Sequence, residues 1–520
     1  MGHANAANLG RLLTQTARRV PGSIALVWGA RAWSWAALDA RVDRLAVALR
    51  DLGVGKGDRV LVHSRNTNAM FETMWACFKA GAVWVPTNFR LTPAEVTYLA
   101  TSSRAVVMIR DAGFAGHAAA VRAASPHLRA VVAVGDAGPG EQDYETLLAG
   151  AVPPPPDHEA AVGYDDPCWF FYTSGTTGRP KAAVLTHGHM AFVVTNHLAD
   201  LMPGTTEHDA SLVVAPLSHG AGIHALAQVA RGARSVLLAG EKFDPAEAWA
   251  LVEEHRVSNM FTVPTILTAL VRDPAVDRHD HASLRHVIYA GAPMYDADQQ
   301  EALAKLGPCL VQYFGLGEVT GNITVLRPDQ HVPDNAGSCG APRTGMEVAI
   351  LGEDGTRLPP DRIGEICVRG PAVFAGYFEN DAANAKAFAG GWFHTGDLGR
   401  MDARGFLFIT GRASDMFISG GSNVYPREAE EAILTHPAVA ECAMVGMPHP
   451  KWGEAGIACV VPRPGMAVEE AAVLAHLRDR IARYKQPLRV VVWDALPKSG
   501  YGKVPKNLVK ARLEAEGVGF

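Results

Sequence analysis

Ten consecutive residues, 172–181, combine small side chains, hydroxyl groups and a single cation in the order YTSGTTGRPK. Glycines let backbone N–H groups approach an anion closely, and serine and threonine hydroxyls add further hydrogen-bond donors. Lys181 places a positive point charge at the end of the run. Residues of these types at this spacing predict a loop that binds phosphate groups.

The run differs from the Walker A loop, whose G-x-x-x-x-G-K-[ST] pattern would need glycine at Pro180 and a hydroxyl residue at Ala182. A flexible Gly/Ser/Thr linker is the simplest alternative. The flanks argue against a linker, because 168–172 reads as a buried strand and 183–185 as a second strand. A loop held between two strands has the rigidity that phosphate binding requires.

The elements that must position this loop alternate between apolar, β-rich runs and helical patterns. The pattern predicts a helix at 70–80 and strands at 59–62, 81–86, 211–216, 235–238 and 286–290. Four prolines at 153–156 exclude a helix or a central strand and indicate a surface connector. This alternation predicts an α/β fold class with layers of sheet and helix.

The C-terminal part of the chain has a different texture. Glycines are dense between 337 and 421, which indicates short β-elements and turns. The tail that follows predicts a helix from 426 to 434, strands at 443–445 and 458–461, and a helix over 468–482. A segment of this size can form a domain of its own.

Composition excludes several classes of protein. At 520 residues the chain exceeds what one hydrophobic core usually organises, so two or more domains are expected. A net charge of −5 offers no basic surface for nucleic acid, and no uncharged apolar stretch is long enough to span a membrane. The seven cysteines contain no C-x-x-C pair, so they indicate neither a disulfide framework nor a zinc site. They predict buried thiols in a cytoplasmic protein.

Four further segments follow the phosphate loop in a fixed order: 312–318 (QYFGLGE), 391–397 (GWFHTGD), 411–428 (with GRASD and SGGSNVYPRE) and 496–503 (LPK, then GK). In this order the five blocks resemble the adenylate-forming (ANL) superfamily of acyl-CoA synthetases, firefly luciferase and peptide-synthetase adenylation domains. The resemblance covers nearly the whole chain. It implies a large N-terminal domain of layered sheets and helices over 1–411 and a small mobile α+β domain over 412–520.

The resemblance also implies a two-step reaction. A carboxylate attacks the α-phosphorus of ATP and gives an acyl-adenylate and pyrophosphate. The thiol of coenzyme A then displaces AMP. The implied enzyme is an acid–thiol ligase, an AMP-forming acyl-CoA synthetase that uses ATP, Mg²⁺ and coenzyme A.

Several residues match the nucleotide site of that superfamily. Glu318 and Thr173 are implied for Mg²⁺, a hard cation that prefers oxygen ligands, and Asp397 is implied for the ribose hydroxyls. Alternatives are a surface acid at Glu318 and a turn-capping role for Asp397. The residues implied for ATP are Thr173, Ser174, Gly175, Thr176, Thr177, Gly178, Lys181, Gly291, Ala292, Pro293, Tyr313, Phe314, Gly315, Asp397, Ile409 and Arg412.

Three residues, Lys503, His219 and Glu318, are implied for catalysis. Lys503 matches the lysine that stabilises charge growing between the carboxylate and the α-phosphate, although a solvated surface lysine is an alternative. His219 matches a position, usually histidine, that lines the carboxylate side. Because Lys503 serves only the first step, the small domain is expected to swing for the second, with its hinge at Ser414. Serine is a departure there, since relatives usually carry Asp or Lys.

For coenzyme A, Arg90 and Trp452 match positions that some ligases use for the phosphates and adenine of this cofactor. Gly420 and Gly421 are implied for the narrow pantetheine channel. The segment 484–488 (YKQPL) lacks a second basic residue that is common there, which weakens the case for coenzyme A.

The acid is expected between 217–224 and 313–321. Small residues at 220, 221, 222, 315 and 317 favour a roomy apolar cavity, and Gly317 replaces the threonine usual in the superfamily. Neither stretch contains a lysine or arginine to pair with a second carboxylate. An aromatic, branched or medium-chain fatty acid is therefore expected. For His224, a core position and a contact with the acid remain equally open.

Two other functions stay open. A stand-alone acyl-adenylating enzyme would pass its acyl group to a carrier protein or an amine. A regulator that binds nucleotide without catalysis is disfavoured by Lys503, Glu318 and the complete phosphate loop. The expected partners are a small carboxylic acid, ATP and CoA, with no nucleic acid and no membrane span, and a homodimer is left open.

Overall fold

The computed structural model describes residues 8–173, 179–240, 242–292, 294–498 and 504–520. Contacts divide the chain into two compact units. The first contains 1–293, 300–347 and 368–393, and the second contains 294–299, 348–367 and 394–520. The second unit thus includes residues that precede the expected boundary at 411/412. That boundary concerns the part that moves, so it stays a prediction.

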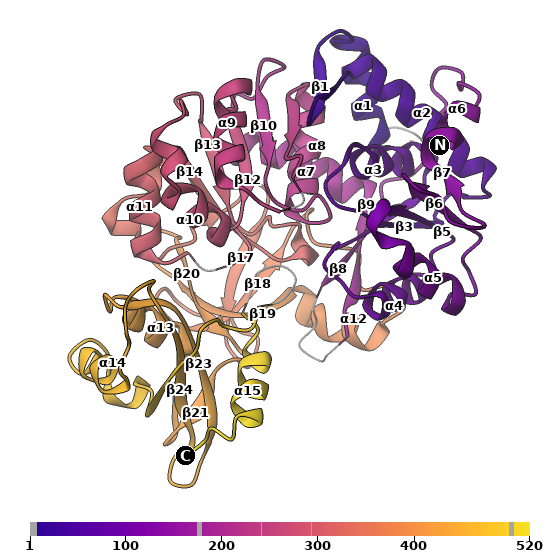
Figure 1. Cartoon of the computed structure of the whole chain (residues 1–520). Coiled ribbons are helices and arrows are strands. Elements are labelled where there is room, and N and C mark those ends of the chain that lie inside the picture. Colours follow the sequence, from indigo (N-terminus) through magenta and orange to yellow (C-terminus); the bar gives the residue numbers. More distant parts are fainter. Residues whose placement is uncertain (1–7, 174–178, 241, 293, 499–503) are drawn as a thin grey trace. The chain divides into compact units, whose positions relative to one another are not determined.

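A nine-stranded sheet forms much of the first unit (Figure 1). Its strands, in sheet order, are β16 (Ala341–Pro342), β15 (Thr324–Leu326), β14 (Leu310–Phe314), β13 (His286–Tyr289), β12 (Asn259–Thr262), β10 (Ala210–Val213), β11 (Arg234–Leu237), β1 (Ile24–Trp28) and β2 (Arg31–Ser34). Neighbours from β10 to β14 are parallel, so their carboxyl ends share one edge. Ligands of open α/β sheets bind at that edge.

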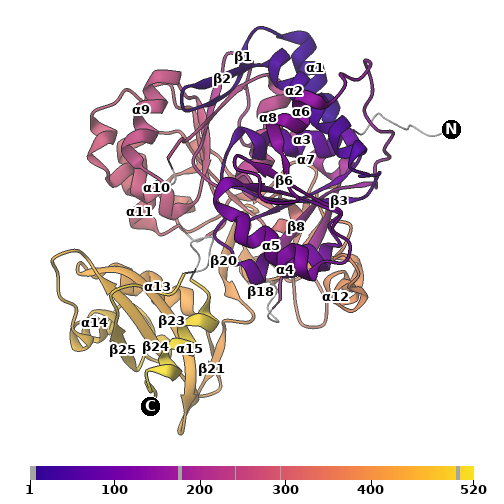
Figure 2. The same ribbon diagram turned by 45° about the vertical axis from the view of Figure 1, so that its right-hand side comes forward.

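A seven-stranded sheet carries the phosphate loop. Its strands, in sheet order, are β7 (Gln142–Asp143), β6 (Ala130–Val134), β5 (Val107–Asp111), β3 (Arg59–His63), β4 (Val83–Thr87), β8 (Pro167–Thr173) and β9 (Lys181–Thr186). β8 and β9 confirm the strands predicted on either side of the loop. On one face, α4 (Pro93–Ser103) and α5 (Ala115–Ala124) pack on apolar residues of β3, β4 and β8 (Figure 2). Cover by helices explains why β8 is almost continuously apolar.

The remaining helices of the first unit follow the expected alternation with strands. They are α1 (Gly10–Arg19), α2 (Trp35–Asp51), α3 (Asn68–Ala80), α6 (Tyr144–Gly150), α7 (His187–Asp200), α8 (Gly220–Arg231), α9 (Pro245–His255), α10 (Pro264–Arg272) and α12 (Asp381–Ala387), while α11 (Asp296–Leu306) has residues in both units. Local chemistry fixes their ends: a Thr92–Glu95 capping box starts α4, and Gly232 with φ +78° ends α8. The prolines at 153–156 lie outside helices and strands, as predicted.

The second unit is built on two sheets. The first is β17 (Glu347–Leu351), β18 (Gly364–Arg369), β19 (Phe393–Met401) and β20 (Leu407–Arg412). The other is β22 (Ser422–Val424), β21 (Phe417–Ser419), β24 (Gly453–Pro462) and β23 (Val439–His449), with β25 (Arg489–Val492) beside β24.

Helices cover both faces of the second of these sheets, because side chains of β23 and β24 alternate in direction. Met444 and Val460 pack with α13 (Pro426–Leu434) and α14 (Glu470–Leu477), whereas Val445 and Ile457 pack with α15 (Lys506–Ala515). This is the α+β architecture predicted for the tail. The helix predicted over 468–482 is shorter, because the side chain of Gln486 donates to the carbonyls of Leu477 and Ile481.

All seven cysteines are buried free thiols, as expected for small core residues. Within the described ranges, none of the helices combines the length and apolar character needed to cross a bilayer.

Candidate active site

Glu318 is the centre of a hydrogen-bonded cluster at the end of the phosphate-loop strand. It lies in the short turn Gly317–Val319 that follows β14, and only 5% of it is exposed. Thr173 donates its Oγ1 hydroxyl to Oε1 of Glu318 at 2.7 Å, and the Tyr377 hydroxyl donates to the same oxygen at 3.0 Å. Among the described residues, Oε2 accepts no hydrogen bond. A carboxylate held this way can present its second oxygen to Mg²⁺, which prefers carboxylates and phosphate oxygens.

Lys181 lies beside the same cluster. It is opposite Thr173 in the β8–β9 ladder, and its Nζ is 4.5 Å from the centroid of the Tyr377 ring. Burial, and then the charge of Glu318, raises the pKa of Tyr377 above its usual range, so the phenol stays protonated and donates. Residues 174–178 of the expected loop lie outside the described residues. Sequence reasoning missed Tyr377, because 59 positions separate it from Glu318.

Aromatic rings gather where the acid is expected. His219 immediately precedes α8, and its ring centroid is 4.8 Å from that of Phe171. Phe261 and Tyr313 stack with centroids 5.9 Å apart and an interplanar angle of 24°. Sequence reasoning included Tyr313 but missed Phe171 and Phe261. Both lie in buried strands, and a strand pattern alone shows them only as core residues.

We expected the small residues of this region to leave a roomy cavity, and this expectation is wrong at four glycines. A Cβ at Gly317 would lie 2.6 Å from Cδ1 of Phe171, and one at Gly220 would lie 2.5 Å from Cζ of Phe261. Cβ atoms at Gly222 and Gly315 would meet backbone atoms at 2.1 Å and 2.5 Å. These glycines permit close packing and do not leave open space.

Two polar residues near the rings are structural. His224 is buried, with Nε2 2.8 Å from Oδ1 of Asn259, and burial lowers its pKa to about 4. His224 therefore lies in the core, and a contact between it and the acid stays a prediction. Arg343, outside both expected stretches, has its guanidinium 5.9 Å from the Tyr313 ring and pairs with Asp200 at 3.7 Å. Burial lowers the pKa of Arg343 to about 10, still high enough to keep it charged at neutral pH.

The second unit holds the residues expected at the ribose. Asp397 on β19 is 5% exposed and faces Arg412 on β20, with Oδ1 3.0 Å from the arginine Nε. Its backbone N–H donates to Oγ1 of Thr395 at 3.0 Å. Ile409 lies on the same strand as Arg412 and is half-buried. The strand pair thus brings the carboxylate and the guanidinium together.

Two residues expected at coenzyme A also meet in this unit. Gly420 donates its N–H to the carbonyl of Trp452 at 2.9 Å. A Cβ at Gly420 would lie 2.9 Å from the indole, and Gly420 and Gly421 have φ of +56° and +83°. Trp452 is 42% exposed, which leaves an aromatic face for stacking.

Other expected residues stand apart from these clusters. Gly291, with φ +85°, and Ala292 follow β13, while Pro293 and Lys503 lie outside the described residues. Phe314 ends β14 and Gly315 follows it. The guanidinium of Arg90 lies 4.8 Å from the Phe89 ring. Ser414 is exposed in the turn after β20 and donates to Asp415 at 3.1 Å.

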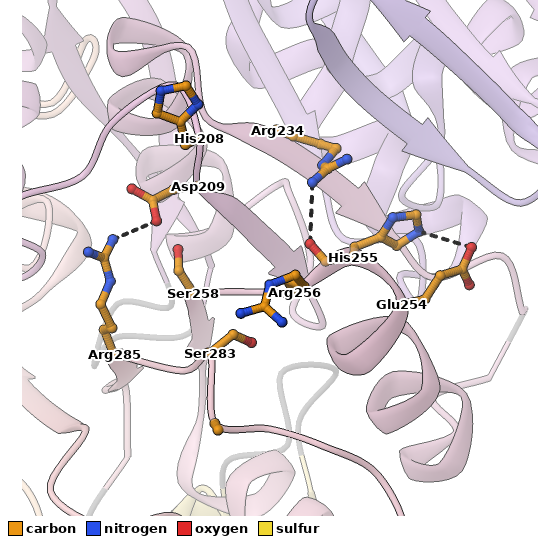
Figure 3. Close-up of a pocket in the computed structure, with 10 residues that line it drawn as sticks. His208, Asp209, Arg234, Glu254, His255, Arg256, Ser258, Ser283 and Arg285 are labelled. Atoms are coloured by element: carbon orange, nitrogen blue, oxygen red, sulfur yellow. Dashed lines mark hydrogen bonds and ion pairs between the residues drawn. The ribbon is translucent and has the colours of Figure 1, made fainter.

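A pocket of about 450 Å³ lies at the opposite edge of the nine-stranded sheet, where the parallel strands begin. Arg285 pairs with Asp209 at 2.5 Å, and Arg234 donates to the carbonyl of His255 at 3.3 Å. Both interactions are drawn in Figure 3. The ion pair joins the starts of β10 and β13, and the second bond joins the start of β11 to the end of α9. The pocket contains none of the residues expected for the reaction.

Comparisons with known proteins identify the family of the chain. The model of the AMP-binding enzyme family matches residues 13–378, and that of the AMP-binding enzyme C-terminal domain matches 428–503. A feruloyl-CoA synthase of Amycolatopsis sp is 39% identical over 97% of this chain and 99% of its own.

Two solved structures are similar over almost their whole length. The anthranilate CoA ligase AuaEII, solved with anthranoyl-AMP, has a TM-score of 0.90 at 25% identity and covers 98% of each chain. The amide bond synthetase McbA from Marinactinospora thermotolerans has a TM-score of 0.89 at 27% identity, over 97% of this chain and 99% of its own. The chain therefore belongs to the AMP-binding enzyme family, within the adenylate-forming superfamily that includes the acyl-CoA synthetases.

Proposed function

We propose that this protein is an ATP-dependent carboxylic acid:CoA ligase that forms an acyl-AMP intermediate, releases AMP and pyrophosphate, and acts on an aromatic acid. The observation that carries the proposal is the buried Glu318 carboxylate, which accepts hydrogen bonds from Thr173 and Tyr377. Lys181 lies beside this cluster, where β9 begins after the phosphate loop. The similarity to CoA ligases over nearly the whole chain supports the same reaction class.

Each group has a distinct task in the first step. Glu318 and Thr173 would hold Mg²⁺, which when bound would neutralise phosphate charge. Lys181 contributes a cation to the β- and γ-phosphates that leave as pyrophosphate. Asp397 accepts hydrogen bonds from the ribose hydroxyls, and Arg412 both holds that carboxylate and adds a donor.

Lys503 is proposed to stabilise the negative charge that grows as the acid carboxylate attacks the α-phosphorus. We expect Lys503→Ala to lower the rate of ATP–pyrophosphate exchange by at least about 100-fold. The same variant should still convert a supplied acyl-adenylate to thioester, because that step does not need this lysine. Unchanged exchange would refute the role.

An aromatic acid is favoured by the rings of Phe171, Phe261 and Tyr313 and by the relatives' names, feruloyl-CoA synthase and anthranilate CoA ligase. The test is pyrophosphate release with a substituted cinnamate, a benzoate, a medium-chain fatty acid and malonate, with mass detection of the thioester. We expect kcat/KM for an aromatic acid to exceed that for the aliphatic acids by at least about tenfold. An aliphatic preference would contradict the aromatic assignment and leave the ligase assignment intact.

Coenzyme A has one alternative as the acceptor of the acyl group in the second step. The likeness to the amide bond synthetase McbA supports an amine as an alternative acceptor. Gly420 beside the exposed Trp452 favours coenzyme A, because an aromatic face and a side-chain-free backbone suit its adenine and its narrow pantetheine arm. AMP formation that never responds to coenzyme A, but responds to amines, would favour an amine as the acceptor. A cytoplasmic location is part of the proposal, since ATP and coenzyme A are pools of that compartment.

A further inference from the structure

Three potential metal ligands of different chemistry lie together on neighbouring strands of the second unit. Glu365 and Cys367 are two residues apart on β18, so their side chains leave the same face of the strand. His394 lies on β19, the next strand in the sheet. Its Nδ1 is 2.8 Å from Oε2 of Glu365 and 3.5 Å from Sγ of Cys367.

The three atoms are arranged closely enough for one ion. The carboxylate oxygen, thiol sulfur and imidazole nitrogen all lie within 4.8 Å of one another. Around a tetrahedral Zn²⁺, with bonds of about 2.0 Å to N and O and about 2.3 Å to S, ligand atoms are separated by about 3.3 to 3.7 Å. Small side-chain rotations would bring the present separations to these values.

The surroundings suit a site with three protein ligands. The side chains of Glu365 and His394 are 31% and 25% exposed, which gives an ion an entry path and leaves room for a water. Cys367 closes the buried end. The N–H of Gly396 donates to Oε1 of Glu365 at 3.0 Å, so the second carboxylate oxygen is already oriented.

We propose that Glu365, Cys367 and His394 bind one divalent cation of the Zn²⁺ class, with water as the fourth ligand. On binding, the Cys367 thiol gives its proton to solvent and the thiolate sulfur bonds to the ion. A change of tautomer moves the proton that Nδ1 of His394 now donates to Glu365 onto Nε2, and the freed Nδ1 lone pair bonds to the ion. The present hydrogen bond between Nδ1 and Glu365 is replaced by one metal bond from each group.

The experiment uses the full-length protein stripped of metal and titrated with Co²⁺, a spectroscopic substitute for Zn²⁺. We expect a thiolate-to-cobalt charge-transfer band in the near ultraviolet that saturates at one ion per chain. Competition with a chromogenic chelator then gives the Zn²⁺ affinity. These readouts need no catalytic activity, so they stand independently of the proposed ligase reaction.

Variants locate the site. Cys367→Ser should lose the charge-transfer band, whereas Cys442→Ser, at another buried cysteine of the same unit, should keep it. Glu365→Gln and His394→Gln should each weaken Zn²⁺ binding by at least about tenfold. No band in the wild type, or the same band in Cys367→Ser, would overturn the proposal. If Cys367→Ser proves unfolded by circular dichroism, undiminished affinity in His394→Gln overturns it instead.

Discussion

At the scale of single residues, Glu318 shows how hydrogen bonds can orient a buried carboxylate. Two hydroxyls donate to one of its oxygens, which fixes the orientation of the group. An ammonium group from Lys181 lies across the Tyr377 ring nearby.

We predict that Glu318→Gln folds normally but is impaired in adenylation. The glutamine carbonyl can still accept from Thr173 and Tyr377, whereas the negative charge for Mg²⁺ is lost. ATP–pyrophosphate exchange should fall about 100-fold and require more Mg²⁺. Tyr377→Phe is the matched control: it removes one donor, keeps the charge and should cost less. An unaltered Mg²⁺ dependence in Glu318→Gln would exclude this role.

Gly317 makes a second prediction at this scale. Threonine is usual at this position in the superfamily, yet a Cβ here would lie 2.6 Å from Phe171 and 2.8 Å from Cγ2 of Thr173. Gly317→Thr should therefore lower stability by about 1 to 3 kcal/mol through overpacking. Calorimetry of the single variant and of its combination with Phe171→Ala tests this. The double variant should lose less stability than the sum of the two single changes.

Comparison with Gly317→Ala separates the Cβ clash from the hydroxyl, since alanine adds the same first atom. If the Gly317→Thr protein were as stable as the wild type, Phe171 would have to move aside at no cost in stability. The close contact at Phe171 would then not exclude a larger side chain at position 317.

Residues inside short contiguous motifs were predictable, and their partners were not. Thr173 stands in a run whose composition indicates phosphate binding, and Glu318 and the pair Asp397–Arg412 stand in motifs that the resemblance to the adenylate-forming superfamily singles out. Tyr377 and Phe171 stand in no such run. Only the fold brings them to Glu318 and Gly317, so no spacing in the chain could reveal them.

At the scale of elements, the strands around the phosphate loop followed from the sequence because strong apolar runs with flanking glycines leave few alternatives. The glycine-rich segment 337–421 was expected to contain short β-elements, but the sequence did not predict which strands pair. Which sheet each strand joins depends on pairings across many residues, as between β18 and β19, and a local pattern does not contain that information.

The turn after β20 gives a prediction about movement. Among the described residues, the Ser414 N–H makes no backbone hydrogen bond, whereas Ala413 N–H donates to Gly396 at 3.0 Å. Proline at 414 would thus preserve the fold while fixing φ and restricting Ala413. If Ser414 is the hinge, Ser414→Pro should keep one half-reaction and lower the other by at least about tenfold.

Ser414→Ala is the matched control for that experiment, because it removes the hydroxyl without restricting the backbone, and it should retain both half-reactions. Pyrophosphate exchange reports the first step, and thioester formation from supplied acyl-adenylate reports the second. Equal, full activity of Ser414→Pro in both would exclude the hinge.

At the scale of the whole molecule, the two compact units are discontinuous in sequence, whereas the sequence predicted one boundary at 411/412. The difference has a physical source. Strands β17 to β20 pair with one another, so residues on both sides of 411 belong to one sheet. Strand pairing determines where one compact unit ends, whereas the position of the hinge determines where the moving part begins. The two boundaries can therefore lie at different residues.

Buried neutral histidines make the first unit sensitive to acid. Burial lowers the pKa of His63 to about 3 and the pKa values of His187 and His224 to about 4, below the ordinary 6.5. Below pH 6.5 these histidines take up protons in the unfolded chain but stay neutral in the folded chain. The free energy of unfolding therefore falls as pH drops from 6.5 towards 4. For His224 alone the loss by pH 4 is at most about 3 kcal/mol.

Thermal unfolding measured from pH 7 to pH 4.5 tests this. We expect the wild-type Tm to fall steeply below pH 6.5, and we expect a shallower fall for His224→Gln. Glutamine can still donate to Asn259, the present partner of Nε2, but cannot take up a proton. His127→Gln, at an exposed position, should keep the wild-type slope. Identical slopes for His224→Gln and the wild type would mean that His224 does not contribute to the acid sensitivity, which would then have to come from His63, His187 or other groups.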